Sequence, residues 1–105
     1  MSLGGDRRKQ KRVPVHCAVY LFREPGIPPA ESTTENLSSE GLYCITKERF
    51  KPGERLQCEV VIPAPFGFES PIVLQCHLTI RRVEYLRHGF GLGCRIDDYS
   101  LRSPI

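Results

Sequence analysis

Two short motifs hold the side chains of this chain that are best suited to binding a ligand. The first is an R-x-x-x-R spacing made by Arg8 and Arg12, and the second is the N-x-S-x-x-G run of Asn36, Ser38 and Gly41. A guanidinium can form paired hydrogen bonds to phosphate oxygens, lie flat on a purine, or bond to the O6 and N7 atoms of guanine. Lysine offers a point charge without that plane, so the two arginines should matter more than the lysines beside them. These residue types suit a small anionic ligand.

Each motif also has an ordinary structural explanation. An R-x-x-x-R spacing arises readily in any basic segment, where it can serve solubility alone. The N-x-S-x-x-G composition is typical of a β-turn, in which Asn and Ser bond the local backbone and Gly supplies a positive φ. Taken singly, the motifs leave ligand binding and a purely structural role both open.

Catalytic chemistry has less support in the sequence. His16, His77 and His88 lie far apart, and no nucleophile elbow, phosphate-binding loop or H-E-x-x-H motif accompanies them. We expect His16 and His77 to be structural residues of strands and His88 to be solvated in a turn. Asp97 and Asp98 adjoin each other near the end of the sequence, where they would cap a turn. The sequence therefore predicts no enzyme, no metal site and no cofactor.

The positive charge is concentrated in one short segment. The net charge is +3, yet residues 1–12 alone contain five basic residues and one acidic residue. A protein that binds duplex DNA would more often spread its basic residues over a face. A local cluster suits a small anion, a membrane surface or an acidic patch on a partner. No apolar stretch approaches the roughly 20 residues that span a bilayer, and no signal peptide is visible, so we expect neither DNA binding nor membrane insertion.

The cysteines indicate a reducing compartment. Their number is odd and they form no C-x-x-C pair, which fits neither a disulfide framework nor a zinc site with paired ligands. Each lies in an apolar, strand-like stretch, where a free thiol behaves as a small hydrophobic group. We therefore expect five buried thiols and a cytoplasmic location: Cys17, Cys44, Cys58, Cys76 and Cys94.

The elements that must position these residues are short strands. With 105 residues the chain is long enough for one domain, and Pro, Gly and small polar residues divide it into short runs. We expect strands at residues 15–22, 32–36, 42–46, 55–62, 72–85 and 90–96, with a turn at 37–41. The fifth strand should bend or bulge near Arg81 and Arg82, and the polar tail from Asp97 could hold one helical turn. Long helices are not expected, and six short strands favour a small closed or nearly closed barrel.

In this order and spacing, the motifs and strands resemble the PilZ domain, the bacterial receptor module for cyclic di-GMP. Arg12 is followed at once by an apolar strand that begins at Val13, and the N-x-S-x-x-G turn leads directly into residues 42–46. The run FGLGCRI at residues 90–96 looks like the last-strand signature of the family. The resemblance covers nearly the whole chain. It implies an all-β, six-stranded antiparallel split barrel at residues 13–105, preceded by a flexible basic arm at residues 1–12.

The resemblance also implies a ligand and a set of contacts. Cyclic di-GMP would be held by Arg8 and Arg12 from the arm and by Asn36, Ser38 and Gly41 from the barrel surface. The side-chain oxygen of Asn36 can accept from the N1–H and N2–H groups of guanine, although many family members have Asp there and make a charge-assisted bond. Ser38 can donate to a phosphate, and Gly41 lets the backbone approach the ligand closely.

The register of the arm has a second possibility, in which Arg7 pairs with Lys11. We favour Arg8 and Arg12 because the second arginine of the family directly precedes the first apolar strand. Arg7 then lies just before the motif and could touch a second nucleotide of a stacked dimer.

The functional expectation is a switch. The ligand would neutralise the arm and order it against the turn, which creates a new surface. An effector protein or a neighbouring domain would recognise that surface. We expect the protein to be a monomer or a weak dimer. Two alternatives stay open: a PilZ-like interaction module that has lost its ligand, and a barrel that binds single-stranded nucleic acid. The latter needs exposed aromatic residues for stacking, whereas most of the four Tyr and five Phe lie in apolar strand positions.

Overall fold

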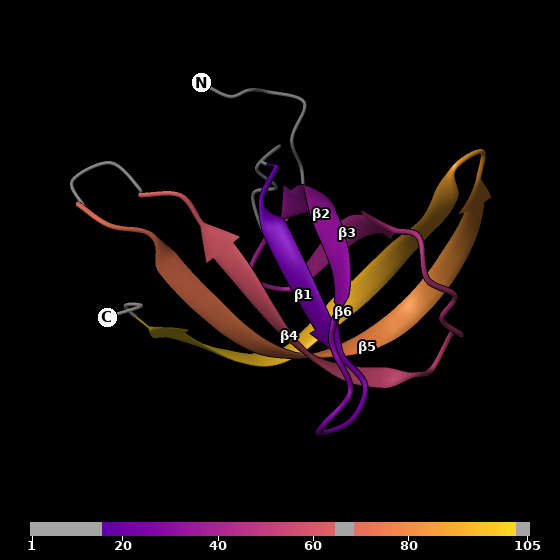
Figure 1. Cartoon of the computed structure of the whole chain (residues 1–105), viewed down its shortest axis with the longest axis horizontal. Coiled ribbons are helices and arrows are strands. Elements are labelled where there is room, and N and C mark those ends of the chain that lie inside the picture. The colour runs from indigo at the N-terminus through magenta and orange to yellow at the C-terminus, as the bar shows by residue number, and fades with distance from the viewer. Residues whose placement is uncertain (1–15, 65–68, 103–105) are drawn as a thin grey trace.

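The computed structural model of the chain describes residues 16–64 and 69–102. Six strands account for most of these residues, and no helix occurs among them (Figure 1). The strands are β1 (Ala18–Phe22), β2 (Ala30–Leu37), β3 (Gly41–Thr46), β4 (Arg55–Ile62), β5 (Ile72–Leu86) and β6 (Gly89–Arg102). Arg7, Arg8 and Arg12 lie outside the described residues, and so does the expected boundary between arm and barrel.

The strands form a closed barrel in the order β1-β2-β3-β6-β5-β4, with every neighbouring pair antiparallel. Strand β1 closes it by pairing on both sides, so that Val19 lies opposite Ser32 of β2 and Val60 of β4. Closure gives every strand two hydrogen-bonded neighbours, and it removes exposed edges that favour aggregation. The predicted all-β, six-stranded antiparallel barrel is confirmed.

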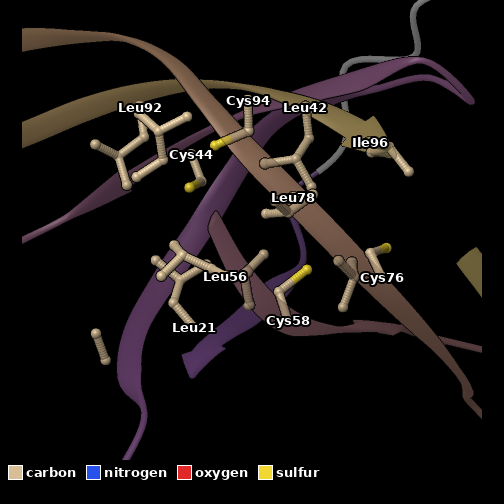
Figure 2. Close-up of a cluster of buried hydrophobic side chains, with 14 of the residues drawn as sticks. Leu21, Leu42, Cys44, Leu56, Cys58, Cys76, Leu78, Leu92, Cys94 and Ile96 are labelled. Carbon is tan, nitrogen blue, oxygen red and sulfur yellow. The ribbon is translucent and has the colours of Figure 1, made fainter. Parts of the chain in front are cut away.

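The interior of the barrel is apolar because alternate residues of each strand point inward. In β4, for example, Leu56, Cys58 and Val60 are buried while the residues between them face outward or are half-buried. Figure 2 shows the leucines and cysteines of several strands meeting in this core. All five cysteines are free and buried, as predicted.

Two pairs of thiols lie side by side in the core. Cys58 lies directly opposite Cys76 across β4 and β5, and its hydrogen bond to Cys76, together with burial, raises the pKa of the Cys58 thiol. The hydrogen bond that Cys94 donates to Cys44, together with burial, likewise raises the pKa of Cys94. Cys58 and Cys94 therefore remain protonated at neutral pH.

The tail of the chain differs from the sequence expectation. Strand β6 does not end at Ile96 but continues to Arg102, because Val73–His77 of β5 provides ladder partners for Asp98–Arg102. The helical turn expected after residue 97 is therefore wrong, and Asp97 and Asp98 are strand residues and not turn caps. The expected irregularity of β5 is present, since its register with β6 shifts between Ile80 and Arg82.

Candidate functional site

The N-x-S-x-x-G motif forms the tight turn between β2 and β3, and Ser38 closes it. The Ser38 backbone N–H donates to the carbonyl oxygen of Gly41 at 2.9 Å. The Ser38 Oγ accepts from the backbone N–H groups of Glu40 and Gly41, each at 3.3 Å. The serine thus holds the turn in shape, as the structural reading of the motif predicts, and its hydroxyl is half-buried at the surface.

Gly41 is required by a neighbouring strand and not by its own φ. Its φ is not positive, in contrast to the glycines of other turns. A Cβ at Gly41 would lie 2.6 Å from the carbonyl oxygen of Cys94 in β6, and this oxygen belongs to the backbone. Gly41 therefore allows β3 to pack closely against β6, which corrects the expectation of a positive-φ turn residue.

Asn36 begins a row of side chains that crosses three further strands. A register shift between Thr34 and Asn36 places Asn36 opposite Tyr43 of β3. Tyr43 in turn lies opposite Gly93 of β6, which lies opposite Arg82 of β5. Asn36 is half-buried, so its amide borders this outward-facing row and not the barrel interior.

The row is fixed by a hydrogen bond that the sequence did not indicate. The Tyr43 hydroxyl donates to Glu84 Oε1 at 2.6 Å, and this bond raises the pKa of Tyr43 to about 12. Arg82 approaches the same carboxylate at 3.5 Å. The phenol lies over Gly91, where any side chain would occupy the position of its hydroxyl. No sequence signal identifies this contact, because Tyr43 and Glu84 are 41 residues apart in the chain.

The chain enters β1 next to the motif. The backbone of Cys17 is fixed to Thr34 by two hydrogen bonds, from Cys17 N–H to Thr34 Oγ1 at 2.8 Å and from Thr34 N–H to the Cys17 carbonyl at 2.9 Å. His16 approaches Glu35, with 3.7 Å between Nδ1 and Oε2. Glu35 directly precedes Asn36, so the first described residue lies beside the end of β2 that carries the motif. His16 is exposed and precedes β1, where the sequence had suggested a strand residue.

Comparison with known proteins identifies this arrangement. The PilZ domain family matches residues 6–104. The chain belongs to the PilZ family. The structure of the Bacillus subtilis inhibitor of motility (MotI/DgrA) resembles this PilZ domain with a TM-score of 0.73 at 15% identity, over 90% of this chain and 44% of that chain. This PilZ domain thus spans less than half of the MotI chain.

The PilZ domain of YcgR from Escherichia coli, solved with cyclic di-GMP, also resembles it. The TM-score is 0.58 at 15% identity, over 89% of this chain and 79% of that chain. At this identity, both likenesses establish a shared fold. No curated protein matches the sequence of this PilZ domain significantly.

Among residues 16–64 and 69–102, no three His, Cys, Asp or Glu side chains are grouped in a way that could hold a metal ion. The same residues include no helix long and apolar enough to cross a membrane.

Proposed function

We propose that this PilZ domain is a receptor for cyclic di-GMP. Asn36, Ser38 and Gly41 would form the barrel side of the site, and Arg8 and Arg12 the arm side. PilZ domains are ligand-binding receptor modules, and the YcgR domain was solved with this ligand. The same YcgR structure supports cyclic di-GMP as the ligand here.

The observation that carries the proposal is the place where the chain enters β1. His16 lies beside Glu35, one residue from Asn36. Arg12 precedes His16 by four residues, and four residues of extended chain span at most about 14 Å. The proposed clamp between Arg12 and the motif turn therefore needs no more than this length of chain.

The turn can change its hydrogen bonds without changing shape. The Ser38 hydroxyl lies 3.4 Å from the Gly41 carbonyl, a distance at which a hydrogen bond is weak. The hydroxyl can instead donate a hydrogen bond to a phosphate oxygen, while Oγ still accepts from the two backbone N–H groups. The Asn36 side-chain oxygen would accept from the N1–H and N2–H of a guanine, and Arg7 would contact a second nucleotide.

The proposed output is an ordering of the arm that an effector protein recognises. Binding would neutralise the arm and fix it against the barrel. The MotI chain is more than twice as long as the part matched here, so a neighbouring domain is an equally suitable recipient. We place this receptor in a bacterial cytoplasm, as a monomer or weak dimer.

Calorimetry on the full chain tests the proposal. Cyclic di-GMP should bind with a micromolar dissociation constant or tighter, whereas GMP and a short oligonucleotide should give little heat. Arg12→Ala should abolish most of the affinity, and Arg87→Ala, an exposed arginine in the β5–β6 hairpin, should leave it unchanged. The absence of heat with cyclic di-GMP would overturn the proposal in favour of an interaction module without ligand.

A further inference from the structure

A cavity of this barrel opens beside the β1–β2 loop. Its volume is about 960 Å³, and it is walled by the β1–β2 loop on one side and by β4, β5 and β6 on the other. The β1–β2 loop precedes β2 and the motif turn follows it, so the two lie at opposite ends of this strand (Figure 1). Ligand pockets typically enclose about 300–1,000 Å³, so this cavity has room for a small organic molecule.

The loop side of the cavity is mainly apolar. Phe22, Pro25, Ile27 and Pro28 line it, and Ile27 is 51% exposed although it is a large aliphatic side chain. The loop is anchored where it begins. Arg23 donates to Glu54 Oε2 at 2.8 Å and to the Arg49 carbonyl, and its guanidinium lies 4.0 Å from the centre of the Phe50 ring. The contacts of Arg23 thus fix the start of the loop whose apolar residues line the cavity.

The strand side of the cavity is a ladder of polar side chains. Arg55 of β4, Thr79 of β5 and Arg95 of β6 lie opposite one another in register. The next rung of the ladder contains His77 and Asp98, whose Nδ1 and Oδ1 atoms are 2.7 Å apart. All of these residues except Thr79 line the cavity directly. The sequence did not predict this grouping, because the last strand was expected to end before residue 98.

The carboxylates on the strand side are already engaged. Asp97 accepts from the Thr79 hydroxyl at 2.6 Å and from Arg95 Nε at 2.7 Å, and these bonds hold its pKa below the usual value. Asp98 is engaged by His77. The Asp97 carboxylate is therefore ionised and faces the charge of Arg95.

Arg55 acts on Asp97 through its charge, which helps to lower the pKa of that carboxyl. Within the described residues, its guanidinium makes no hydrogen bond or ion pair, and Arg95 is engaged through Nε alone. Glu24 also lines the cavity, but from the loop side. Arg55 and Arg95 lie on either side of Thr79 in register, and the Asp97 carboxylate already bonds to both Thr79 and Arg95. The donors of Arg55 therefore suit an added anionic group with more than one acceptor oxygen.

We propose that this cavity binds a small organic anion with an apolar or aromatic body. A carboxylate or phosphate ester would accept hydrogen bonds from Arg55, and the body would pack against Phe22, Ile27 and the loop prolines. This site uses none of the residues proposed to bind cyclic di-GMP, so it stands independently of that function. Arg95 is nevertheless the register partner of Gly41, which places the two sites next to each other on β6.

Three ligands with one ring system test the proposal. The ¹⁵N-labelled full chain is titrated with 2-naphthoate, 2-naphthylmethanol or 2-naphthylmethylamine and followed by two-dimensional NMR. Naphthoate should give saturable shifts in residues 22–28, 55–57 and 95–98, with weaker binding of the alcohol and weakest binding of the amine. Equal affinity for all three, shifts outside these segments, or no saturable shift at millimolar concentrations would overturn the proposal.

Matched variants separate the charge from the apolar wall. Arg55→Gln should weaken naphthoate binding by about tenfold, the scale of one charge-assisted contact, and leave the alcohol unaffected. Ile27→Ala should weaken both ligands, and the control Arg87→Gln neither. Cyclic di-GMP binding is measured on the same variants and should be unchanged, so that a failure here is distinguishable from a failure of the receptor function. Unchanged naphthoate affinity in Arg55→Gln contradicts the assignment.

Discussion

At Gly41, the need for glycine comes from the backbone of β6. A Cβ there would stand 2.6 Å from the Cys94 carbonyl oxygen, and a backbone atom in a barrel ladder cannot move aside without moving its strand. The motif therefore combines residues of two kinds. Gly41 sets the separation of β3 and β6, whereas Asn36 and Ser38 present polar atoms at the surface.

Gly41→Ala should consequently destabilise the protein even without ligand. We expect the free energy of unfolding to fall by about 1–3 kcal/mol, the usual effect of forcing extra atoms into packed structure. Urea unfolding of the ligand-free protein measures it, with Asn36→Ala as the comparison variant. Unchanged stability together with lost ligand binding would show that the glycine serves the ligand alone.

Arg8→Lys tests whether the arm recognises a base or only contributes charge. Lysine keeps the charge but lacks the plane and the paired donors, so we expect affinity for cyclic di-GMP to fall by ~1–3 kcal/mol. Lys9→Ala removes a charge from the same arm and should cost less. Calorimetry at physiological salt compares the two. The reverse order would indicate a nonspecific trap for anions and would revive nucleic-acid binding.

At the scale of elements, Tyr43 and Glu84 tie β3 to β5 across the intervening β6. The hydrogen bond of 2.6 Å passes over Gly91, which leaves the space for the ring. It raises the pKa of Tyr43 from 10.0 to about 12. Because the protonated phenol is the form that the fold favours, this contribution to stability is complete below pH 10 and is lost as the pH rises toward 12.

The tyrosinate absorbance of the folded protein reports this link. Of the four tyrosines, we expect Tyr43 to titrate at about pH 12, with loss of that late step in Tyr43→Phe. In Glu84→Gln the carboxylate charge is absent, so the same step should move toward the ordinary tyrosine range. A titration in which Tyr43→Phe removes an early step would contradict the bond.

The elements differ in how far the sequence determines them. Strands β3 and β4 were predictable because buried residues alternate regularly between clear turn residues. The last residues of β6, DDYSLR, are polar and have no such alternation. They are a strand because β5 extends beside them, and pairing with a distant segment leaves no local signal. The Arg55–Thr79–Arg95 row could not be predicted either, because it also depends on pairing between separate strands. The motif turn is local, and the sequence predicts it.

At the scale of the whole molecule, closure is the dominant property. Strand β1 contributes only five residues, yet its pairing with both β2 and β4 completes the barrel. Each strand is then held by a neighbour on each side along part of its length. Opening the barrel at any one seam exposes the common core, so partial unfolding should be costly and global unfolding cooperative.

The distribution of cysteines makes this cooperativity measurable. One cysteine lies in each of β3, β4, β5 and β6, and Cys17 immediately precedes β1. A buried, protonated thiol does not react with iodoacetamide until its strand is exposed and the thiolate can form. Alkylation followed by peptide mass spectrometry should therefore find all five cysteines reacting at one common rate in mild urea. Faster alkylation of Cys17 alone would show that the barrel opens first at β1. The alkylation rate of each cysteine thus reports how readily its own strand becomes exposed.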